Sequence, residues 1–419
     1  MGALPSVRYD RGTMSRPLAE NDLLTDARAL RERLVAIRRT LHAQPEYGFQ
    51  EHQTAALIAR EMTALGARVR TGVGKTGVVA ELGQGSPVIA VRADMDALPI
   101  QEATGLPFAS KVPGMMHACG HDAHVTCGIG AAMLLAERLA GAGTGTGAGT
   151  GGVQGTVRWL FQPSEEQKDD EGLSGAMRML DDGALDGVDA AISLHTRALT
   201  AGSIGVTSGP ALAANDTITI TVQGKAAHGA RPHEGIDALA IAAQVIVAVN
   251  HIVSRRVPAI EPGVISLTTI NGGLKENIVC DNVTIGGTVR STGGAAREHI
   301  LREIERALEV GRVLGAKCSL HVKEGYPLLR NDPGITDAVR LAATESLGAA
   351  HVVDLPYSTW AEDFAYIAER VPASMFWLGV TSPGAEDPVW HSPTFTIDED
   401  ALPIGATVFA ASVLKLLRA

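Results

Sequence analysis

The segment between residues 211 and 323 constrains the fold of this chain most, because its patterns form a complete order of elements. A strand-like run, TITITV, is followed by a helical pattern, two further strand-like runs, a second helical pattern and a last strand-like run. These patterns occupy residues 217–222, 237–255, 264–270, 283–289, 298–314 and 318–322. The order β-α-β-β-α-β is that of ferredoxin-like domains, so we predict a self-contained α+β domain here.

The residues before and after this segment show a different pattern, in which short β-branched runs alternate with helical periodicity. Strands are predicted at residues 78–82, 88–93, 157–161 and 190–194, and helices at 21–41, 51–65, 126–140 and 175–180. Strands that alternate with helices favour an α/β layer with a largely parallel sheet. Because the middle is complete in itself, we expect a discontinuous α/β domain at 20–210 and 324–419, with the domain at 211–323 inserted into it.

The composition limits the class of protein and its partners. A length of 419 residues favours two domains, since a single core rarely grows so large. A formal net charge of −10 argues against a nucleic-acid partner, and four cysteines without a CxxC pair fit a reducing compartment. The longest apolar run, Ala238–Val249, is shorter than the roughly 18 residues that a membrane span needs. We therefore expect a soluble, cytoplasmic protein that does not bind a membrane.

One low-complexity tract, GAGTGTGAGTGG at Gly141–Gly152, lies between a predicted helix and a predicted strand. Such a tract cannot pack into a core, and we expect a flexible surface loop. It lacks the GK[ST] ending of a phosphate-binding loop, so it predicts no function.

The stretch MHACGHDAHVT, Met116–Thr126, concentrates three histidines, a cysteine and an aspartate in eleven residues. Cys119 and His121 stand on either side of Gly120, a spacing that allows both side chains to reach one centre from a loop. Thiolate and imidazole are ligands of zinc and neighbouring metals. Three interpretations stay open at this point: a metal site, a nucleophilic cysteine, or a polar loop without a chemical role.

Two adjacent carboxylates, Glu165 and Glu166 in QPSEE, follow the strand predicted at 157–161. Open α/β sheets place their ligand crevice at such strand ends. Adjacent acids point in different directions, so one can bind a metal while the other acts as a general base in hydrolysis. The competing interpretation is a solvated acidic turn, which the acidic run QKDDE that follows supports.

Three further segments place polar side chains at predicted strand ends or in nearby loops. Asp94 and Asp96 follow a strand in RADMD and can bind a metal or orient a ligand histidine. His195 lies in AISLHT and His391 in VWHSPTF. Each residue alone is a weak signal, but a two-metal site needs about this many ligands from separate segments.

Several motifs occur together and in a fixed order: RADMDALPIQE, MMHACGHDAHVT, FQPSEE, GKAAHGARPHEGIDA, GGTVRS, AEDFAYI and HSPTFTIDEDAL. In this combination the chain resembles the metal-dependent amidohydrolase and peptidase family of aminoacylases, hippurate hydrolases and indole-acetyl-amino-acid hydrolases. The resemblance covers nearly the whole chain from about Leu24. It implies an α/β fold in which a mixed-sheet, dinuclear-metal catalytic domain carries an inserted ferredoxin-like lid or dimerisation domain.

The resemblance also implies a metal centre and a catalytic base. Glu165 matches the family's general base, which takes a proton from the attacking water and passes it to the leaving amine. Asp96 matches an aspartate that orients a ligand histidine, and Cys119 matches a bridge between two divalent ions, Zn, Mn, Co or Ni, in each subunit. The implied metal ligands are Cys119, His121, Glu166, His195 and His391.

Three residues of the middle segment match family residues that contact substrate. His228 matches a histidine that stabilises the oxyanion, often in the partner subunit's active site, which implies a homodimer or higher homo-oligomer. Asn277 and Arg290 match residues that hold the substrate, with Arg290 as a fork for a carboxylate.

The sequence departs from the family pattern at three places. Cys280 stands where the family usually has proline, which puts the turn near Asn277 in question, and Ala361 stands where it usually has glycine. Thr196-Arg197, directly after His195, replaces a commoner aliphatic or aromatic pair. Ala361 can narrow the floor of the pocket, and Thr196-Arg197 can change which substrates fit.

The function that the resemblance implies is metal-dependent hydrolysis of the amide bond of N-acyl amino acids. The alternative within enzymes is a metal-dependent carboxypeptidase or dipeptidase that acts on short peptides with the same fold and metals. A nucleophilic Cys119 is a hypothesis from another class, and a bridging role for its thiolate excludes it. A non-catalytic binding protein is a further hypothesis, against which the intact ligand set argues.

Overall fold

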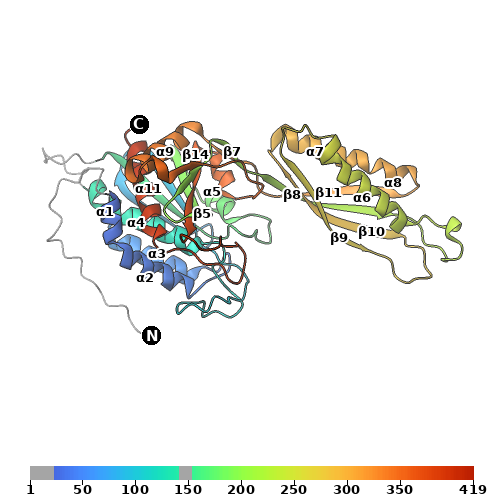
Figure 1. Cartoon of the computed structure of the whole chain (residues 1–419), viewed down its shortest axis with the longest axis horizontal. Helices are drawn as coiled ribbons and strands as arrows, with labels where there is room; N and C mark the ends of the chain where they lie inside the picture. The colour runs from blue at the N-terminus through green and yellow to red at the C-terminus, as the bar shows by residue number, and fades with distance from the viewer. Residues whose placement is uncertain (1–22, 141–152) are drawn as a thin grey trace.

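The computed structural model describes residues 23–140 and 153–419, and Figure 1 shows that these residues form two lobes. The larger lobe is built from both ends of the chain around an eight-stranded sheet, and the smaller lobe contains a four-stranded sheet. The loop predicted at Gly141–Gly152 lies outside the described residues.

The larger lobe takes most of its elements from the first half of the chain. These are α1 (Leu23–Ala29), α2 (Arg31–His42), α3 (His52–Ala64), β1 (Arg68–Val73), β2 (Gly77–Gln84), β3 (Val88–Asp94), α4 (His121–Ala140), β4 (Gly155–Gln162), α5 (Gly175–Asp181), β5 (Ala190–Thr200), β6 (Ile204–Val206) and β7 (Gly209–Leu212). The last part of the chain adds β12 (Leu329–Asn331), α9 (Pro333–Leu347), β13 (Val352–Asp354), α10 (Phe364–Ala368), β14 (Ala373–Thr381) and α11 (Ala401–Leu416).

Two of the predicted helices have different bounds in the structure. The helix predicted at 21–41 is two helices, because the chain makes a turn at Leu30 between α1 and α2. The helix predicted at 126–140 begins earlier, at His121, because Gly120 has a φ of +93° and turns the chain into the helix there. His121 is therefore the first residue of a helix and not part of a loop.

The eight strands of the larger lobe lie in the order β1-β2-β4-β3-β5-β14-β6-β13. The central strands β4, β3, β5 and β14 run parallel to one another, whereas β1, β2 and β6 pair antiparallel with neighbours nearer the centre of the sheet. The short loop between β1 and β2 allows only an antiparallel pair. The sheet is thus mixed, and the expectation of a largely parallel sheet holds only for its centre.

Helices cover both faces of this sheet. The main core cluster includes buried residues of α2, α3, α4, α9 and α11, and a second cluster on the other face includes residues of α5 and α10. Gly130 of α4 lies so close to α11 and α2 that a Cβ atom there would be 2.8 Å from the Cβ of Ala406 and 3.0 Å from Cδ2 of Leu34. Glycine therefore allows these helices to pack closely over the sheet.

The smaller lobe has the predicted order of elements. It contains β8 (Ala214–Gln223), α6 (Ala238–Arg255), β9 (Gly263–Gly272), β10 (Asn282–Ser291), α7 (Gly294–Ala307), α8 (Glu309–Val313) and β11 (Lys317–Glu324). Its strands lie in the order β11-β8-β10-β9, and every neighbouring pair is antiparallel. The helix predicted at 298–314 is interrupted at Leu308. The division of the chain into separate domains at 211–323 stays a prediction.

Helix α6 covers the small sheet with one face. The carboxylate of Asp237 caps its start by accepting hydrogen bonds from the N–H groups of Leu239 at 3.0 Å and Ala240 at 3.3 Å. Val245 and Val249 lie in the core of the smaller lobe. By length and composition this helix could cross a membrane, because it continues to Arg255. The apolar run considered in the sequence is shorter and ends at Val249. In the structure it packs against the sheet.

We expect Gly130→Val to destabilise the protein by about 1–3 kcal/mol, because the added side chain must separate α4 from α11 and α2. Urea unfolding measures the free energy of unfolding directly. Glu137→Ala, at an exposed position of the same helix, is the control and should change it by less than about 0.5 kcal/mol. Equal stability of the two variants would contradict this account of the helix packing.

Candidate functional site

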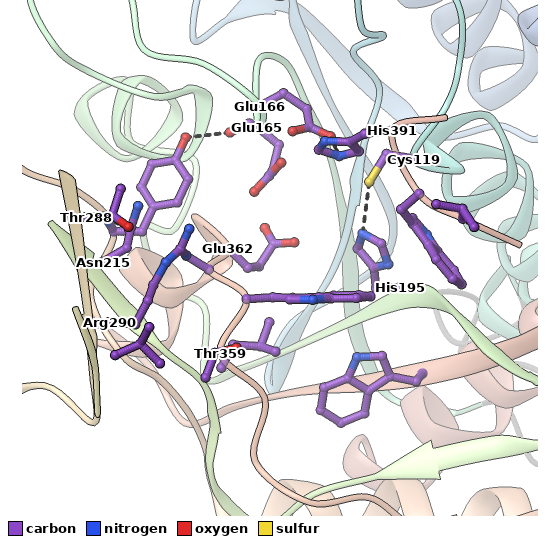
Figure 2. A pocket seen from close by; sticks show the side chains of 18 of the residues that line it. Cys119, Glu165, Glu166, His195, Asn215, Thr288, Arg290, Thr359, Glu362 and His391 are labelled. Carbon is purple, nitrogen blue, oxygen red and sulfur yellow. Dashed lines mark hydrogen bonds and ion pairs between the residues drawn. The ribbon is translucent and has the colours of Figure 1, made fainter. Parts of the chain in front are cut away.

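A cavity of about 990 Å³ lies between the two lobes, and Figure 2 shows most of the side chains that line it. Polar and titratable side chains of the larger lobe form one side of the cavity. Residues of β9 and β10, which belong to the smaller lobe, also line it. The predicted site residues among the lining are Cys119, Glu165, Glu166, His195, Arg290 and His391. Residues from both lobes therefore contribute to one cavity.

The five predicted metal ligands come together in this structure. The Sγ of Cys119 lies 3.5 Å from Nε2 of His195, and Nε2 of His391 lies 3.0 Å from Oε1 of Glu166. Cys119 belongs to two groups whose ligand atoms lie within 4.8 Å of one another, one with His121 and His195 and one with Glu166 and His391. The thiol is thus common to both groups. We name these five residues the ligand cluster.

Local structure fixes the position of Cys119. A Cβ atom at Gly120 would lie 2.6 Å from Oγ1 of Thr196, so only glycine fits at this left-handed position. The hydroxyl of Thr196 also lies 3.1 Å from the carbonyl oxygen of Cys119 and donates a hydrogen bond to it. His195 lies within β5, not at a strand end as predicted, because β5 continues alongside β14 as far as Thr200.

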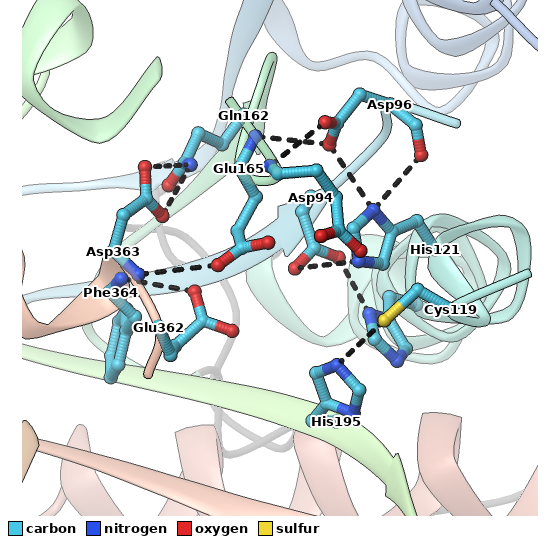
Figure 3. Close-up of polar contacts among 12 residues, drawn as sticks. Asp94, Asp96, Cys119, His121, Gln162, Glu165, His195, Glu362, Asp363 and Phe364 are labelled. Atoms are coloured by element: carbon cyan, nitrogen blue, oxygen red, sulfur yellow. Dashed lines mark hydrogen bonds and ion pairs between the residues drawn. The ribbon is translucent and has the colours of Figure 1, made fainter. Parts of the chain in front are cut away.

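The imidazole of His121 is oriented by Asp96 (Figure 3). Its Nδ1 lies 3.0 Å from the main-chain oxygen and 3.2 Å from a carboxylate oxygen of Asp96, so this nitrogen carries a proton and donates. Its Nε2 is buried and has no hydrogen-bond partner among the described residues. A buried imidazole nitrogen without a hydrogen-bond partner, beside a thiol and a second imidazole, fits a metal ligand.

Electrostatics also favour a cation in the ligand cluster. Burial lowers the pKa of His121, but the carboxylates of Asp94 and Asp96 raise it more, to about 10. Burial and the nearby carboxylates of Glu166 and Glu165 raise the pKa of the Cys119 thiol. These surroundings stabilise positive charge, whereas a nucleophilic thiolate needs positive neighbours. The geometry therefore favours a metal ligand over a nucleophile at Cys119.

His124 shares its segment with these ligands but has other partners. Its Nδ1 lies 2.6 Å from Oδ1 of Asp94, and its Nε2 accepts a hydrogen bond from the N–H of Thr196 at 3.0 Å. Both nitrogens are therefore occupied within the protein. His124 supports the strand that carries His195.

Glu165 lies beside the ligand cluster among other carboxylates (Figure 3). It forms a group with Glu362 and Asp363 whose oxygens lie within 4.8 Å of one another, and the N–H of Asp363 lies 3.4 Å from Oε1 of Glu165. Burial and the charge of Glu362 raise the pKa of Glu165. The motif AEDFAYI gave no sign of a role for its two acids, and the structure places both beside Glu165.

The segment that leads from the smaller lobe back to the larger lobe is hydrogen-bonded to Glu165. The hydroxyl of Tyr326, just after β11, donates a hydrogen bond to the carbonyl oxygen of Glu165 at 2.5 Å. The N–H of Tyr326 donates to Oδ1 of Asn215, at the start of β8, at 2.6 Å. The two chain crossings between the lobes therefore meet beside the carboxylate pair, a contact that no sequence motif indicated.

Glu51 stabilises the turn at Ser164, which directly precedes Glu165 and Glu166. Ser164 has a φ of +45°, which is unusual for a residue with a side chain. Its N–H donates to Oε1 of Glu51 at 2.8 Å, and the hydroxyl of Thr76 donates to Oε2 at 2.5 Å. Burial and the charge of Asp96 raise the pKa of Glu51 to about 7. Glu51 therefore stabilises the main-chain conformation that aims Glu165 and Glu166.

Of the three site residues predicted in the smaller lobe, only Arg290 lines the cavity. His228 and Asn277 are exposed and lie in neighbouring loops, where the N–H of Gly229 donates to the carbonyl oxygen of Asn277 at 2.8 Å. Cys280, at the position of the expected proline, is buried and donates to the carbonyl oxygen of Asn282. The structure does not bring His228 and Asn277 into the cavity of their own chain.

Comparison with known proteins identifies the family. Residues 90–415 match the family described as Peptidase family M20/M25/M40, and the N-acetyl-L-cysteine deacetylase of Bacillus subtilis is 39% identical over 409 residues, 95% of this chain and 93% of that protein. The chain belongs to peptidase family M20/M25/M40. This M20 chain is also similar to the thermostable carboxypeptidase 1 of Saccharolobus solfataricus. The two are 36% identical over 401 residues, which cover 94% of this chain and 98% of the carboxypeptidase.

A solved structure supports the M20 fold. The YXEP protein of Bacillus subtilis, a dinuclear metal-binding peptidase from the M20 family, has a TM-score of 0.80 and 36% identity, and the match covers 93% of this chain and 99% of that one. Membership of the M20 family confirms the family resemblance of the sequence motifs. The mixed α/β fold is confirmed as well.

The buried carboxyl of Glu51 predicts a pH dependence of stability for the metal-free protein. Its pKa is about 7 in the folded chain and about 4.3 in an unfolded one, so its contribution is complete below about pH 4 and is lost as the pH rises through 7. We expect Glu51→Gln to cost more stability at pH 5 than at pH 8, with a difference of up to about 3 kcal/mol.

Urea unfolding of chelator-treated wild type and variant at both pH values measures this difference. Glu171→Gln, at an exposed carboxylate, is the control and should have the same small effect at both values. A cost of Glu51→Gln that does not change with pH would contradict the raised pKa.

Proposed function

We propose that this chain hydrolyses the amide bond of N-acyl amino acids at the cavity between its lobes, with two divalent metal ions. The observation that carries the proposal is the ligand cluster with the buried carboxylate of Glu165 beside it. Two relatives of Bacillus subtilis are named for deacetylation of N-acetylcysteine, and an IAA-amino acid hydrolase of Arabidopsis thaliana is 36% identical to this chain. These relatives support this substrate class.

Each of the two groups within the ligand cluster would hold one ion, and Cys119 belongs to both groups. His121 and His195 belong to one group, and Glu166 and His391 to the other. Imidazole, thiolate and carboxylate together suit Zn, Mn, Co or Ni. Asp96 is a positioning residue, because it holds His121 in the tautomer that leaves Nε2 free.

Bound divalent ions would polarise the substrate carbonyl and activate water for attack. Glu165 would take the proton from the water and deliver it to the leaving amine, since its carboxylate faces the same cavity. Arg290 would bind the substrate carboxylate: its guanidinium lines the cavity, makes no ion pair in the described chain, and has a pKa lowered by burial. A fork of this kind orients the amino-acid end of the substrate.

A carboxypeptidase or dipeptidase activity on short peptides is the second candidate. It is favoured by the similarity to the thermostable carboxypeptidase 1 of Saccharolobus solfataricus. Turnover of N-acetyl and N-benzoyl amino acids, compared with that of unblocked dipeptides at equal concentration, distinguishes the two. Exclusive turnover of dipeptides would overturn the first candidate.

We also propose a homodimer in which His228 acts in the cavity of the partner chain. His228 is exposed and lies outside the cavity of its own chain, while β9 is an edge strand of the small sheet. An exposed histidine outside the cavity of its own chain can reach a second copy. We further propose a cytoplasmic location and no nucleic-acid or membrane partner, in accord with the four free cysteines and the net charge of −10.

We expect Glu165→Gln to lower kcat by roughly 10²–10⁴-fold, as removal of a general base does, while the metal content per chain stays unchanged. Elemental analysis and steady-state kinetics measure both quantities. Glu171→Gln is the control and should keep its kcat. A chelator should abolish turnover in the wild type and added divalent metal should restore it. Full turnover by Glu165→Gln would contradict the role of this residue.

Mixed dimers test the role of His228. We expect Glu165→Gln and His228→Ala each to be inactive as homodimers, and a re-associated equal mixture to recover roughly a quarter of wild-type activity. The reason is that half of the dimers are mixed and each of these has one intact site. No recovery, with mixed dimers demonstrated by differently tagged chains, would show that His228 does not act across the interface.

A further inference from the structure

The residue pair that follows the ligand His195 in β5 contacts two tryptophans of the cavity. The hydroxyl of Thr196 lies 3.3 Å from Nε1 of Trp390 and accepts its hydrogen bond. The guanidinium carbon of Arg197 lies 4.2 Å from the centre of the Trp360 ring. Thr196-Arg197 is the pair at which the sequence departs from the family pattern. The two residues that depart from the family pattern therefore contact one specific part of the cavity wall, its two tryptophans.

The two indoles form a continuous aromatic surface, which we call the indole wall. The rings of Trp360 and Trp390 lie 5.8 Å apart with 52° between their planes, and both residues line the cavity. Trp390 packs on Phe395 at 5.5 Å, whereas Trp360 is 41% exposed. An exposed indole in a cleft is a surface that a ligand can cover.

The indole wall lies next to the reacting groups in sequence and in space. Trp390 directly precedes the ligand His391, and Trp360 lies two residues before Glu362 beside Glu165. Arg290, which would hold the substrate carboxylate, belongs to the smaller lobe. Consider a substrate whose carboxylate contacts Arg290 and whose amide lies at the ligand cluster. Its acyl group would then lie against the indole wall of the larger lobe.

Arg197 supports the wall from outside the cavity. It is half-buried, it is not among the residues that line the cavity, and its Nη1 is buried with no hydrogen-bond partner among the described residues. Burying a guanidinium without an anionic partner is unfavourable, so the stacking on Trp360 is the interaction that holds it there. The cation covers one face of the indole and fixes its orientation, which leaves the ring available to the cavity.

We propose that the indole wall is the acyl subsite and selects planar aromatic acyl groups, with Thr196 and Arg197 as positioning residues. The inference rests on the proposed hydrolysis of N-acyl amino acids. A flat ring stacks on an indole at 4.5–7 Å between centres, whereas a methyl group covers little of it. The further apolar side chains of the cavity, Leu212, Trp377 and Val389 among them, suit the same class of acyl group.

The test compares three acyl groups on one amino acid: benzoyl, cyclohexanecarbonyl and acetyl. Benzoyl and cyclohexanecarbonyl have nearly equal size, but only the first is planar. Because the two amides also differ in intrinsic reactivity, the change in their ratio of kcat/KM between wild type and a variant isolates the stacking. We expect wild type to prefer benzoyl to acetyl by at least about 10-fold and to prefer benzoyl to cyclohexanecarbonyl. Trp360→Leu should reduce the benzoyl preference by about 10-fold, and Trp360→Phe should retain most of it.

Arg197 is tested by the same ratio, which a general loss of folding does not change. Arg197→Met keeps the length of the side chain but removes the cation, and should lower the benzoyl to cyclohexanecarbonyl ratio mainly through a higher KM for the benzoyl substrate. Arg340→Met, at a surface salt bridge on α9, is the matched control and should leave the ratio unchanged.

The possible failures are distinguishable. Equal kcat/KM for benzoyl, cyclohexanecarbonyl and acetyl substrates in wild type would overturn the aromatic subsite while the proposed hydrolysis stands. An unchanged ratio in both Trp360→Leu and Arg197→Met would overturn the role of the indole wall. Turnover of unblocked dipeptides without turnover of any N-acyl amino acid would overturn the proposed function and with it this inference.

Discussion

The carboxylate of Asp96 is the interaction on which the rest of the site depends. Its two oxygens accept hydrogen bonds from the main-chain N–H groups of Glu165 and Glu166, each at 3.1 Å, and one oxygen lies 3.2 Å from Nδ1 of His121 (Figure 3). Asp96 is 1% exposed, so water does not compete for these contacts. One buried side chain therefore fixes the loop after β4 and the first residue of α4 in a common frame.

The charge of this region is balanced by a second buried group. Arg92 in β3 is fully buried and pairs with Asp94 at 2.7 Å and with Glu362 and Asp363 at 2.8 Å. A buried charge without a partner would cost several kcal/mol, and here one guanidinium compensates carboxylates from two distant segments. The carboxyl groups of Glu165, Glu166 and Glu362 line the cavity, which is where a divalent cation would be stabilised.

Much of this site could be predicted from the sequence, because the signals are local. A thiol and an imidazole around Gly120, and a carboxylate pair directly after a strand, are properties of short segments. The order of elements in the smaller lobe is likewise visible as periodicity. The roles of Glu362 and Tyr326 could not be predicted, since their partner Glu165 lies far from them in the chain and only packing brings these segments together.

The sequence by itself determined the kinds of groups available for chemistry and the two classes of fold, because side-chain type and hydrophobic period need no tertiary information. Only the tertiary structure decided where these groups lie. It brought together the five residues of the ligand cluster, left His228 exposed outside its own cavity, and placed Arg197 against Trp360. The reason is physical: distances between remote segments are fixed by helix and sheet packing, which no local pattern encodes.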